Sequence, residues 1–228
     1  MPVGVRVVHK HDPALGMESN DLHWLSDDEL IRYQSISSSH RKQQFLVGHY
    51  LARKMASRFY GNTIEDWIYF MDVDNQRRLK CRQAGIPEIH VSLSHSGDWV
   101  AAGISLSPIG IDIETYGKQR DFIAIASHVF SKSETDLLKS LATENVNRQF
   151  YLYWTLKECV AKQYGAGLKF EISRAHSFIP ATDPAAASIF SWQCPDYVVA
   201  MAGESSGDIA TSGLYEPAEK LCWQNIPA

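Results

Sequence analysis

The sequence predicts an α+β fold, on three observations. Apolar residues recur with helical spacing over residues 39–60 and again around residues 152–160. Alternating apolar and polar residues, typical of half-buried strands, occupy several shorter segments. Two helix-ending stretches, Arg58-Phe59-Tyr60-Gly61 and Lys162-Gln163-Tyr164-Gly165, are similar, and each is followed by strand-like sequence. This self-similarity is slight, but it agrees with a chain of two similar halves.

The first half of the chain is expected to hold two helices and three strands. Ser26-Asp27-Asp28-Glu29 is a capping box, which predicts the start of a short helix. A longer helix over residues 39–60 has an apolar face and ends at Gly61. The expected strands cover residues 67–73, 88–94 and 99–105, and the last two form a hairpin.

The second half is expected to begin with a strand at residues 108–115. Short helices follow at residues 121–129 and 134–141. The second of these begins with the capping box Ser131-Lys132-Ser133-Glu134, which gives Glu134 a complete structural explanation. The helix that contains Trp154 ends at Gly165-Ala166-Gly167, and strands are expected at residues 168–179 and 188–201.

Composition narrows the class of protein. The 228 residues are 45% hydrophobic and 21% charged, which is ordinary for a globular protein and enough for a sizeable core. There is no signal-peptide-like or membrane-spanning apolar run, so we expect a cytoplasmic protein without membrane contact. The four cysteines form no Cys-x-x-Cys pair, and neither a zinc site nor a disulfide framework is indicated. The net charge of −4 argues against nucleic-acid binding.

Two carboxylates lie together in the segment Gly110-Ile111-Asp112-Ile113-Glu114. The alternation directs both isoleucines to one face of a strand and both acids to the other. Residues two apart on a strand have Cα atoms about 6.5 Å apart, so both acids could reach one ion. Two such charges repel each other unless a cation or protons lie between them. An ordinary solvent-facing strand edge is the alternative explanation.

A third acid and a lysine share one face of the later helix. Glu158 and Lys162 are four residues apart, so they project together. An exposed helical ion pair would also explain them. Combined with the two acids of the strand, they predict a site for a divalent metal and phosphate.

Basic residues are concentrated between His40 and Arg82, where nine stand against four acidic ones. A basic region on an acidic protein suits a phosphate-rich ligand or an acidic partner protein. Solvated helix faces account for at least half of these residues.

Four motifs together resemble the 4′-phosphopantetheinyl transferases. They are Ser92-Leu93-Ser94-His95-Ser96-Gly97, Gly110-Ile111-Asp112-Ile113-Glu114, Phe130-Ser131-Lys132-Ser133-Glu134, and Trp154-Thr155-Leu156-Lys157-Glu158 with Lys162. The first resembles the element that marks the longer, Sfp-like branch of the family. The resemblance implies two α+β halves related by a pseudo-two-fold axis, with the ligand in a cleft between them. We therefore expect halves at residues 1–106 and 107–228, with the metal site in the second half, and a monomer.

The resemblance implies a transferase. It would move the 4′-phosphopantetheine arm of coenzyme A to a serine of an apo acyl or peptidyl carrier protein and release 3′,5′-adenosine bisphosphate. Asp112, Glu114 and Glu158 would hold Mg²⁺. Asp112, Glu158 and Lys162 would be the catalytic residues, and the base that accepts the serine proton would be Glu158 or a metal-bound hydroxide.

The resemblance also assigns coenzyme A-binding residues. Lys162, His95 and Ser94 would contact the phosphates. Arg53 would bind a phosphate from the long helix, and Lys80 matches a phosphate-binding lysine of the family. Roles for Arg41 and Glu134 stay open. A nucleophilic triad of Ser94, His95 and Asp98 is disfavoured, because neighbours on a strand face opposite ways and no nucleophile elbow is present.

Two other functions fit the same residues. One is a Mg²⁺-dependent hydrolase of coenzyme A or nucleotide phosphodiesters, which would need no carrier protein. The other is a non-catalytic module that binds coenzyme A and docks carriers. The sequence does not reveal which carrier or pathway is served, and both the Arg77–Arg82 region and the Lys54/Arg58 face are candidate docking surfaces.

Overall fold

The computed structural model describes residues 3–17, 22–117, 120–165, 167, 169, 173–183, 185–204, 209–212 and 218–227. Its α-helices are α1 (Asp27–Ser35), α2 (Ser39–Tyr60), α3 (Phe122–Val129), α4 (Lys132–Ser140) and α5 (Thr143–Gln163). Its strands are β1 (Gly4–His9), β2 (Trp67–Met71), β3 (Arg77–Cys81), β4 (Ile89–Ser96), β5 (Trp99–Ser105), β6 (Ile109–Thr115), β7 (His176–Pro180), β8 (Ile189–Gln193), β9 (Tyr197–Gly203), β10 (Ala210–Ser212) and β11 (Glu219–Pro227). The described residues therefore confirm the predicted mixture of helices and strands.

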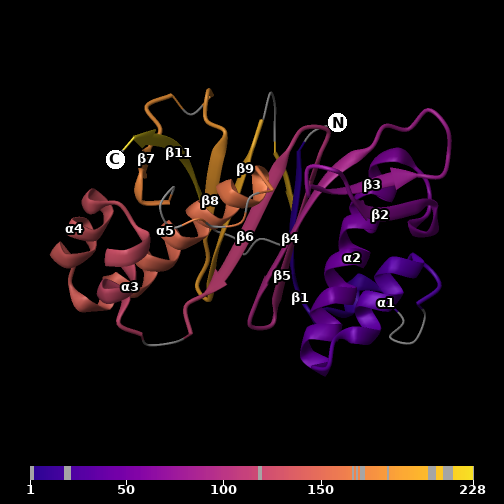
Figure 1. Cartoon of the computed structure of the whole chain (residues 1–228), viewed down its shortest axis with the longest axis horizontal. Coiled ribbons are helices and arrows are strands. Elements are labelled where there is room, and N and C mark those ends of the chain that lie inside the picture. Colours follow the sequence, from indigo (N-terminus) through magenta and orange to yellow (C-terminus); the bar gives the residue numbers. More distant parts are fainter. Residues whose placement is uncertain are drawn as a thin grey trace.

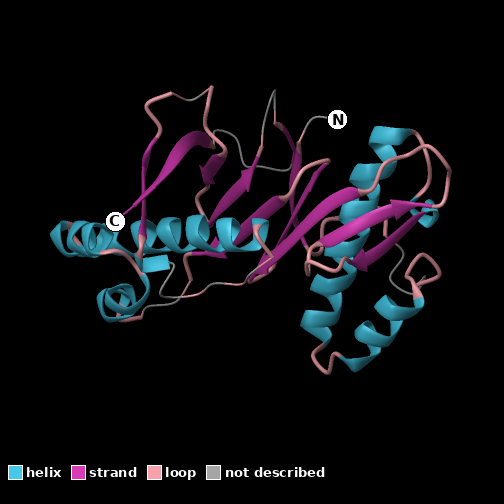
Figure 2. Cartoon of the chain, turned by 45° about the horizontal axis from the view of Figure 1, so that its top comes forward, coloured by secondary structure: helices cyan, strands magenta, loops and turns pink. Residues whose placement is uncertain are grey.

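The strands form two sheets, and each sheet has one long helix against it. The first sheet has the order β10-β1-β5-β4-β3-β2 and packs against α2 (Figure 1). The second has the order β6-β9-β8-β11-β7 and packs against α5. Figure 2 shows α1 and α2 at one end of the molecule and α3 and α4 at the other, with α5 running from that end towards the central strands. The strands where the two sheets meet, β4 and β6, lie in the middle.

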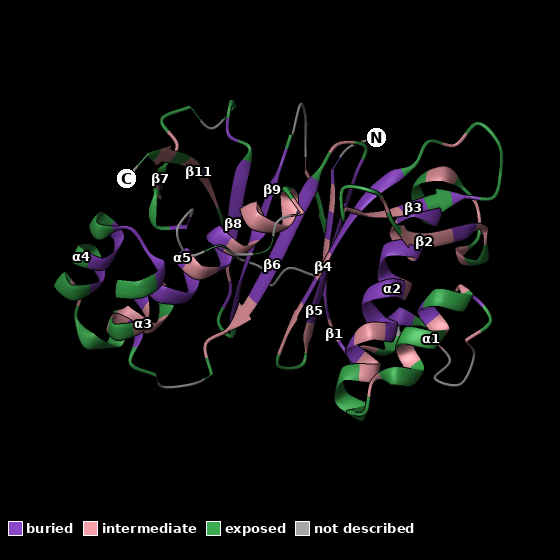
Figure 3. Ribbon diagram, in the orientation of Figure 1, coloured by how far each residue is buried: buried purple, intermediate pink, exposed green. Residues whose placement is uncertain are grey.

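One buried apolar cluster lies between the two sheets and holds them together. Val5 and Val7 of β1 share an apolar cluster with Ile111 and Ile113 of β6. A second cluster lies between α2 and the first sheet, and a third between α5 and the second sheet. The strands at the centre are accordingly buried along most of their length (Figure 3). Because Ile111 and Ile113 face this core, Asp112 faces the opposite way, as the alternation predicted.

Gly110 allows α5 to lie directly on β6. A Cβ atom at Gly110 would stand 1.8 Å from the carbonyl oxygen of Cys159 and 2.6 Å from the backbone nitrogen of Gln163. Only glycine permits two backbones to approach this closely. The close approach brings the C-terminal end of α5, with Glu158 and Lys162, beside the acids of β6.

Several boundaries differ from the sequence-based expectations. The strand expected at residues 188–201 is two strands, β8 and β9, because the backbone turns between Gln193 and Tyr197. Of the strand expected at residues 168–179, only the end is observed, as β7, and part of the segment lies outside the described residues. Strands β1, β3, β10 and β11 were not predicted.

The expected boundary between residues 106 and 107 falls in the link between β5 and β6. The C-terminal β10 pairs in parallel with β1, so a segment from the second half of the chain extends the first sheet. The division into two halves and their pseudo-two-fold relation stay predictions. Of the helices in the described ranges, none combines the length and apolarity that crossing a membrane requires.

Candidate functional site

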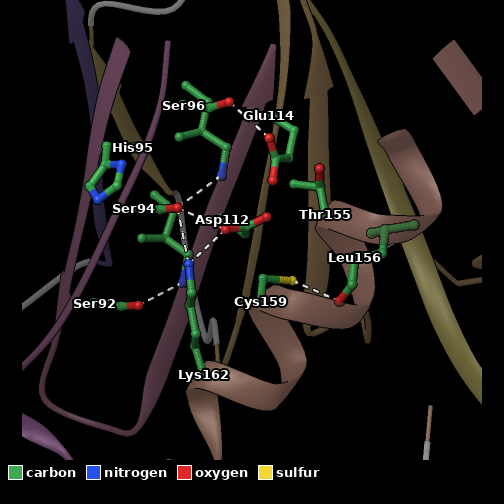
Figure 4. Close-up of polar contacts among 12 residues, drawn as sticks. Ser92, Ser94, His95, Ser96, Asp112, Glu114, Thr155, Leu156, Cys159 and Lys162 are labelled. Atoms are coloured by element: carbon green, nitrogen blue, oxygen red, sulfur yellow. Dashed lines mark hydrogen bonds and ion pairs between the residues drawn. The ribbon is translucent and has the colours of Figure 1, made fainter. Parts of the chain in front are cut away.

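The two acids of β6 are held by serines of β4. Ser94 Oγ donates a hydrogen bond to Asp112 Oδ1 over 2.7 Å, and Ser96 Oγ donates to Glu114 Oε2 over 2.8 Å (Figure 4). The two strands belong to different sheets. The acids therefore lie at the contact between the sheets, and side chains from both sheets fix their positions.

Lys162 reaches the same place from α5. Its Nζ lies 2.6 Å from Asp112 Oδ1 and 3.0 Å from Ser94 Oγ (Figure 4). Burial raises the pKa of Asp112, while the ammonium group of Lys162 and the hydroxyl of Ser94 act in the opposite direction. The sequence-based expectation that the strand and the helix meet here agrees with this geometry. It brings together Asp112, Ser94 and Lys162.

Glu158 lies one helical turn before Lys162 and is partly buried. Burial raises the pKa of Glu158, and the negative charge of Asp112 raises it further. Glu158 is thus close enough to Asp112 for their charges to interact. Within the described ranges, however, no three histidine, cysteine, aspartate or glutamate side chains are arranged as a ready-made metal cluster. The second carboxylate oxygen of Asp112 is buried and has no hydrogen-bond partner among the residues described.

The pKa of Glu114 reflects its burial and the negative charges close to it. Burial raises its pKa to about 7, and Asp112 and Glu158 contribute in the same direction. The hydrogen bond from Ser96 and the charge of Lys162 oppose the shift without cancelling it. Three acids with one lysine leave excess negative charge, which a hard divalent cation would neutralise. The unpartnered oxygen of Asp112 and the raised pKa of Glu114 both fit such a cation.

A cavity of about 270 Å³ lies on the α2 side of β4. Three arginines from three different elements line it: Arg32 of α1, Arg41 of α2 and Arg77 of β3. His95 and Ser94 of β4 are also part of the lining. Ser94 belongs to the strand that separates this cavity from the acids: the residue is part of the cavity lining, and its hydroxyl points to the other face of β4, towards Asp112 and Lys162. The cavity is therefore strongly positive and adjoins the negative site.

His95 lies against one of these arginines. A guanidinium nitrogen of Arg41 is 2.5 Å from His95 Nε2. Burial lowers the pKa of His95 to about 4, and the charges of Arg41 and Lys162 lower it further. His95 is consequently neutral at physiological pH and can contact a phosphate as a neutral hydrogen-bond donor, whereas the arginines supply the charge.

Arg53 does not face this cavity, which corrects the phosphate-binding role that the sequence suggested. Its side chain is fully buried. Its guanidinium binds both carboxylate oxygens of Glu29, at 2.9 and 2.5 Å, and donates to the Trp67 carbonyl. His49 also contacts Glu29, at 2.6 Å. A buried arginine whose donors are already occupied cannot bind a ligand without rearrangement, and Arg41 is the better-placed arginine of α2.

Lys80 is exposed on β3 and is not among the residues that line the cavity. It lies on the same face of the strand as Arg78, which pairs with Asp72 and stands opposite His90 of β4. This is the face of the sheet from which Ser92, Ser94 and Ser96 project. A phosphate-binding role for Lys80 stays a prediction.

Glu134 and Lys157 form a buried pair away from the acids of β6. Lys157 Nζ lies 2.8 Å from Glu134 Oε2, and it donates to the carbonyls of Ser173 and His176. Glu134 also closes the capping box of α4 and accepts from the backbone of Phe178. These contacts tie α4, α5 and β7 together, which accounts for Glu134 structurally.

Three residues at the site were given no site role from the sequence: Arg32, Arg77, which was named only in a candidate docking region, and Ser96, which was quoted only as part of a motif. Arg32 follows the capping-box acid Glu29 by three residues, but nothing in the helix pattern indicates a ligand. The spacing of Ser92, Ser94 and Ser96 was a usable signal, because period two on a strand directs all three hydroxyls to one side.

Comparisons with known proteins agree with the motifs. The profile of the 4′-phosphopantetheinyl transferase superfamily matches residues 108–207. The chain is 32% identical over 165 residues to the 4′-phosphopantetheinyl transferase Sfp of Bacillus subtilis strain 168, covering 71% of this chain and 70% of that one. It is 35% identical over 128 residues to the 4′-phosphopantetheinyl transferase psf-1 of Bacillus pumilus, covering 56% of this chain. The aligned segment spans only about half (52%) of psf-1.

Proposed function

Because the chain belongs to the 4′-phosphopantetheinyl transferase family, we propose that it transfers the 4′-phosphopantetheine arm of coenzyme A to a serine of an apo acyl or peptidyl carrier protein. The observation that carries the proposal is that a cavity lined by three arginines and a group of acids with a lysine lie on the two faces of β4 at Ser94. Coenzyme A carries a pyrophosphate and a separate 3′-phosphate. A site that binds it is therefore expected to combine basic side chains with acids that hold a metal close by.

We assign the phosphate contacts by charge. Arg32, Arg41 and Arg77 line the cavity and would neutralise phosphate oxygens, with His95 as a neutral donor. Lys162 Nζ lies at the edge of the acid cluster and would contact the pyrophosphate. Asp112, Glu114 and Glu158 would hold Mg²⁺, which supplies charge stabilisation for the departing 3′,5′-adenosine bisphosphate.

We assign the general base to Glu158. The serine hydroxyl of the carrier attacks the β-phosphorus, and its proton passes to the Glu158 carboxylate as the bond to 3′,5′-adenosine bisphosphate breaks. Burial and Asp112 raise the pKa of Glu158 when no metal is bound. The proposed role as base rests on its position one helical turn before Lys162 and near Asp112. Most of the rate enhancement is expected from positioning and electrostatics, as in phosphoryl transfer generally.

We further propose that the protein acts as a cytoplasmic monomer on a carrier protein, without nucleic-acid or membrane partners. The net charge of −4 supports the first exclusion. The basic residues of β3, among them Arg78 and Lys80, offer a surface for an acidic carrier.

Intact-mass spectrometry of an apo carrier protein tests the proposal. The carrier is incubated with the protein, coenzyme A and Mg²⁺, and the expected result is a gain equal to the phosphopantetheine arm. Omission of Mg²⁺ should abolish the gain. Breakdown of coenzyme A without any carrier would indicate the hydrolase instead. Binding of coenzyme A that is indifferent to Mg²⁺, with no change in carrier mass, would indicate a non-catalytic module.

A further inference from the structure

A ladder of serine hydroxyls joins the two sheets. Strand β6 is the edge strand of its sheet, so the backbone N–H groups on its outer side have no neighbouring strand in that sheet to accept them. Three of these groups, at Ile111, Ile113 and Thr115, donate to serine hydroxyls of β4. The acceptors are Ser92, Ser94 and Ser96, at 2.9, 3.4 and 3.1 Å respectively.

The three serines differ in the acceptors to which their hydroxyl groups donate. Ser96 Oγ accepts from Thr115 N and contacts Thr115 Oγ1 at 3.2 Å, while it lies 2.8 Å from Glu114 Oε2. A carboxylate can only accept, so the single hydroxyl proton of Ser96 is directed to Glu114. Ser92, by contrast, is placed against the backbone of Ile111 (Figure 4). Of the three serines, Ser92 contacts the backbone of β6, whereas Ser94 and Ser96 also hold the acids Asp112 and Glu114.

We propose that Ser96 is a positioning residue for the metal site, and that it fixes the Glu114 carboxylate so that its other oxygen is free to bind the cation. This inference rests on the proposed function, because it requires Glu114 to be a metal ligand. Hydrogen bonds to charged acceptors are stronger than those between neutral groups, and partners of metal ligands strongly affect metal affinity. The two neighbouring residues of the motif thus serve different sites. His95 faces the cavity, and Ser96 faces Glu114.

Ser96 also makes the metal site dependent on the contact between the sheets. Its backbone belongs to the first sheet, and the carboxylate that it holds belongs to the second. Ser94 has the same arrangement with Asp112, but it also contacts Lys162 and lines the cavity, so its substitution would change several interactions together. Ser96 is therefore the cleaner position to test.

Ser96→Ala and Ser92→Ala form a matched pair. Each variant removes one hydroxyl from the ladder and leaves one N–H of β6 without its acceptor, but only Ser96→Ala releases Glu114. Binding of Mn²⁺ to the full-length protein is measured by electron paramagnetic resonance, without coenzyme A or carrier. Ser96→Ala is expected to weaken Mn²⁺ binding by about 10- to 100-fold. Ser92→Ala is expected to retain parental affinity, and Ser96→Thr, which keeps the hydroxyl, should lie close to the parent.

Thermal melts of all variants show whether they are folded at the temperature of the binding measurement. Equal Mn²⁺ affinity in Ser96→Ala and Ser92→Ala overturns the inference, whether both match the parent or both fall together. Loss of affinity in Ser96→Thr as large as in Ser96→Ala also overturns it. A parent protein that binds no Mn²⁺ overturns the proposed metal site and this inference with it, whereas parental binding with unaffected variants overturns the inference alone.

Discussion

Replacing Arg53 by methionine should cost stability and leave coenzyme A binding intact. Burial alone would raise the pKa of Glu29, but hydrogen bonds from His49 and Arg53 outweigh it and lower the pKa from 4.5 to about 2. One pKa unit corresponds to about 1.4 kcal/mol, so the net effect of burial and these partners favours the folded state by about 3 kcal/mol. Removing one partner of a buried ion pair typically costs about 3–5 kcal/mol, which agrees.

The loss of folding stability in Arg53→Met can be measured as a decrease in the melting temperature. For a chain of this size, each kcal/mol shifts the melting temperature by about 2–4 °C, so Arg53→Met should melt about 6–12 °C below the parent. The pKa of Glu29 is lowered in the folded state, so its contribution is present above about pH 4.5 and is lost as pH falls towards 2. The variant should therefore show a weaker loss of stability over that acidic range than the parent does.

Arg41→Met is the matched comparison, because it removes an arginine from the same helix whose side chain is exposed and lines the cavity. We expect it to raise the KM for coenzyme A by about tenfold, as befits the loss of a charge-assisted phosphate contact, with little change in melting temperature. Steady-state transfer kinetics and calorimetry on both variants make the test. The reasoning is refuted if Arg53→Met raises the KM for coenzyme A and melts like the parent.

Three further outcomes are expected. Asp112→Asn should lower kcat by about a hundredfold or more while melting within a few degrees of the parent, since its partner Lys162 is partly exposed and can be solvated; a near-parental rate contradicts the metal assignment. The pKa of Glu114, raised to about 7, means that the folded protein without metal binds a proton that the unfolded chain has released. Its stability should therefore fall as pH rises from about 4.5 to 7, and Mg²⁺ should raise the melting temperature more at alkaline than at acidic pH; equal increments would exclude this. Glu134→Gln leaves the Lys157 ammonium buried without its counterion, so the melting temperature should fall by about 6–20 °C, with an unchanged KM for coenzyme A.

Local patterns predicted much of the fold and half of the site. The alternation of residues 110–114 correctly directed Ile111 and Asp112 to opposite faces, because period two is a property of any strand. The capping boxes at Ser26 and Ser131 are both observed, since they depend on only four residues each. The spacing of Glu158 and Lys162 likewise needed only the geometry of one helix.

The features that the sequence did not predict correctly depend on contacts between segments far apart in the chain. Arg53 carries the same charge whether it binds a phosphate or a buried glutamate, and only the position of α1 shows that Glu29 has taken it. The pairing of β10 with β1 joins residues about 200 positions apart, which no local pattern can encode. Arg32 and Arg77 likewise become cavity residues only once α1 and β3 are placed beside α2.

The structure contains two buried capping-box acids with different physical roles from the acids of β6. Glu29 and Glu134 each receive a cation that is itself buried, so their charges are neutralised within the protein. Asp112 and Glu114 share one partly exposed lysine and keep an unpartnered oxygen and a raised pKa. Among the described residues, the chain provides one buried cation for each of these structural acids but only one lysine for the acids of β6. The excess negative charge is therefore specific to the site on β6. A divalent cation would supply the compensation that the chain does not, at a place where hydroxyls from the opposite sheet already hold both carboxylates.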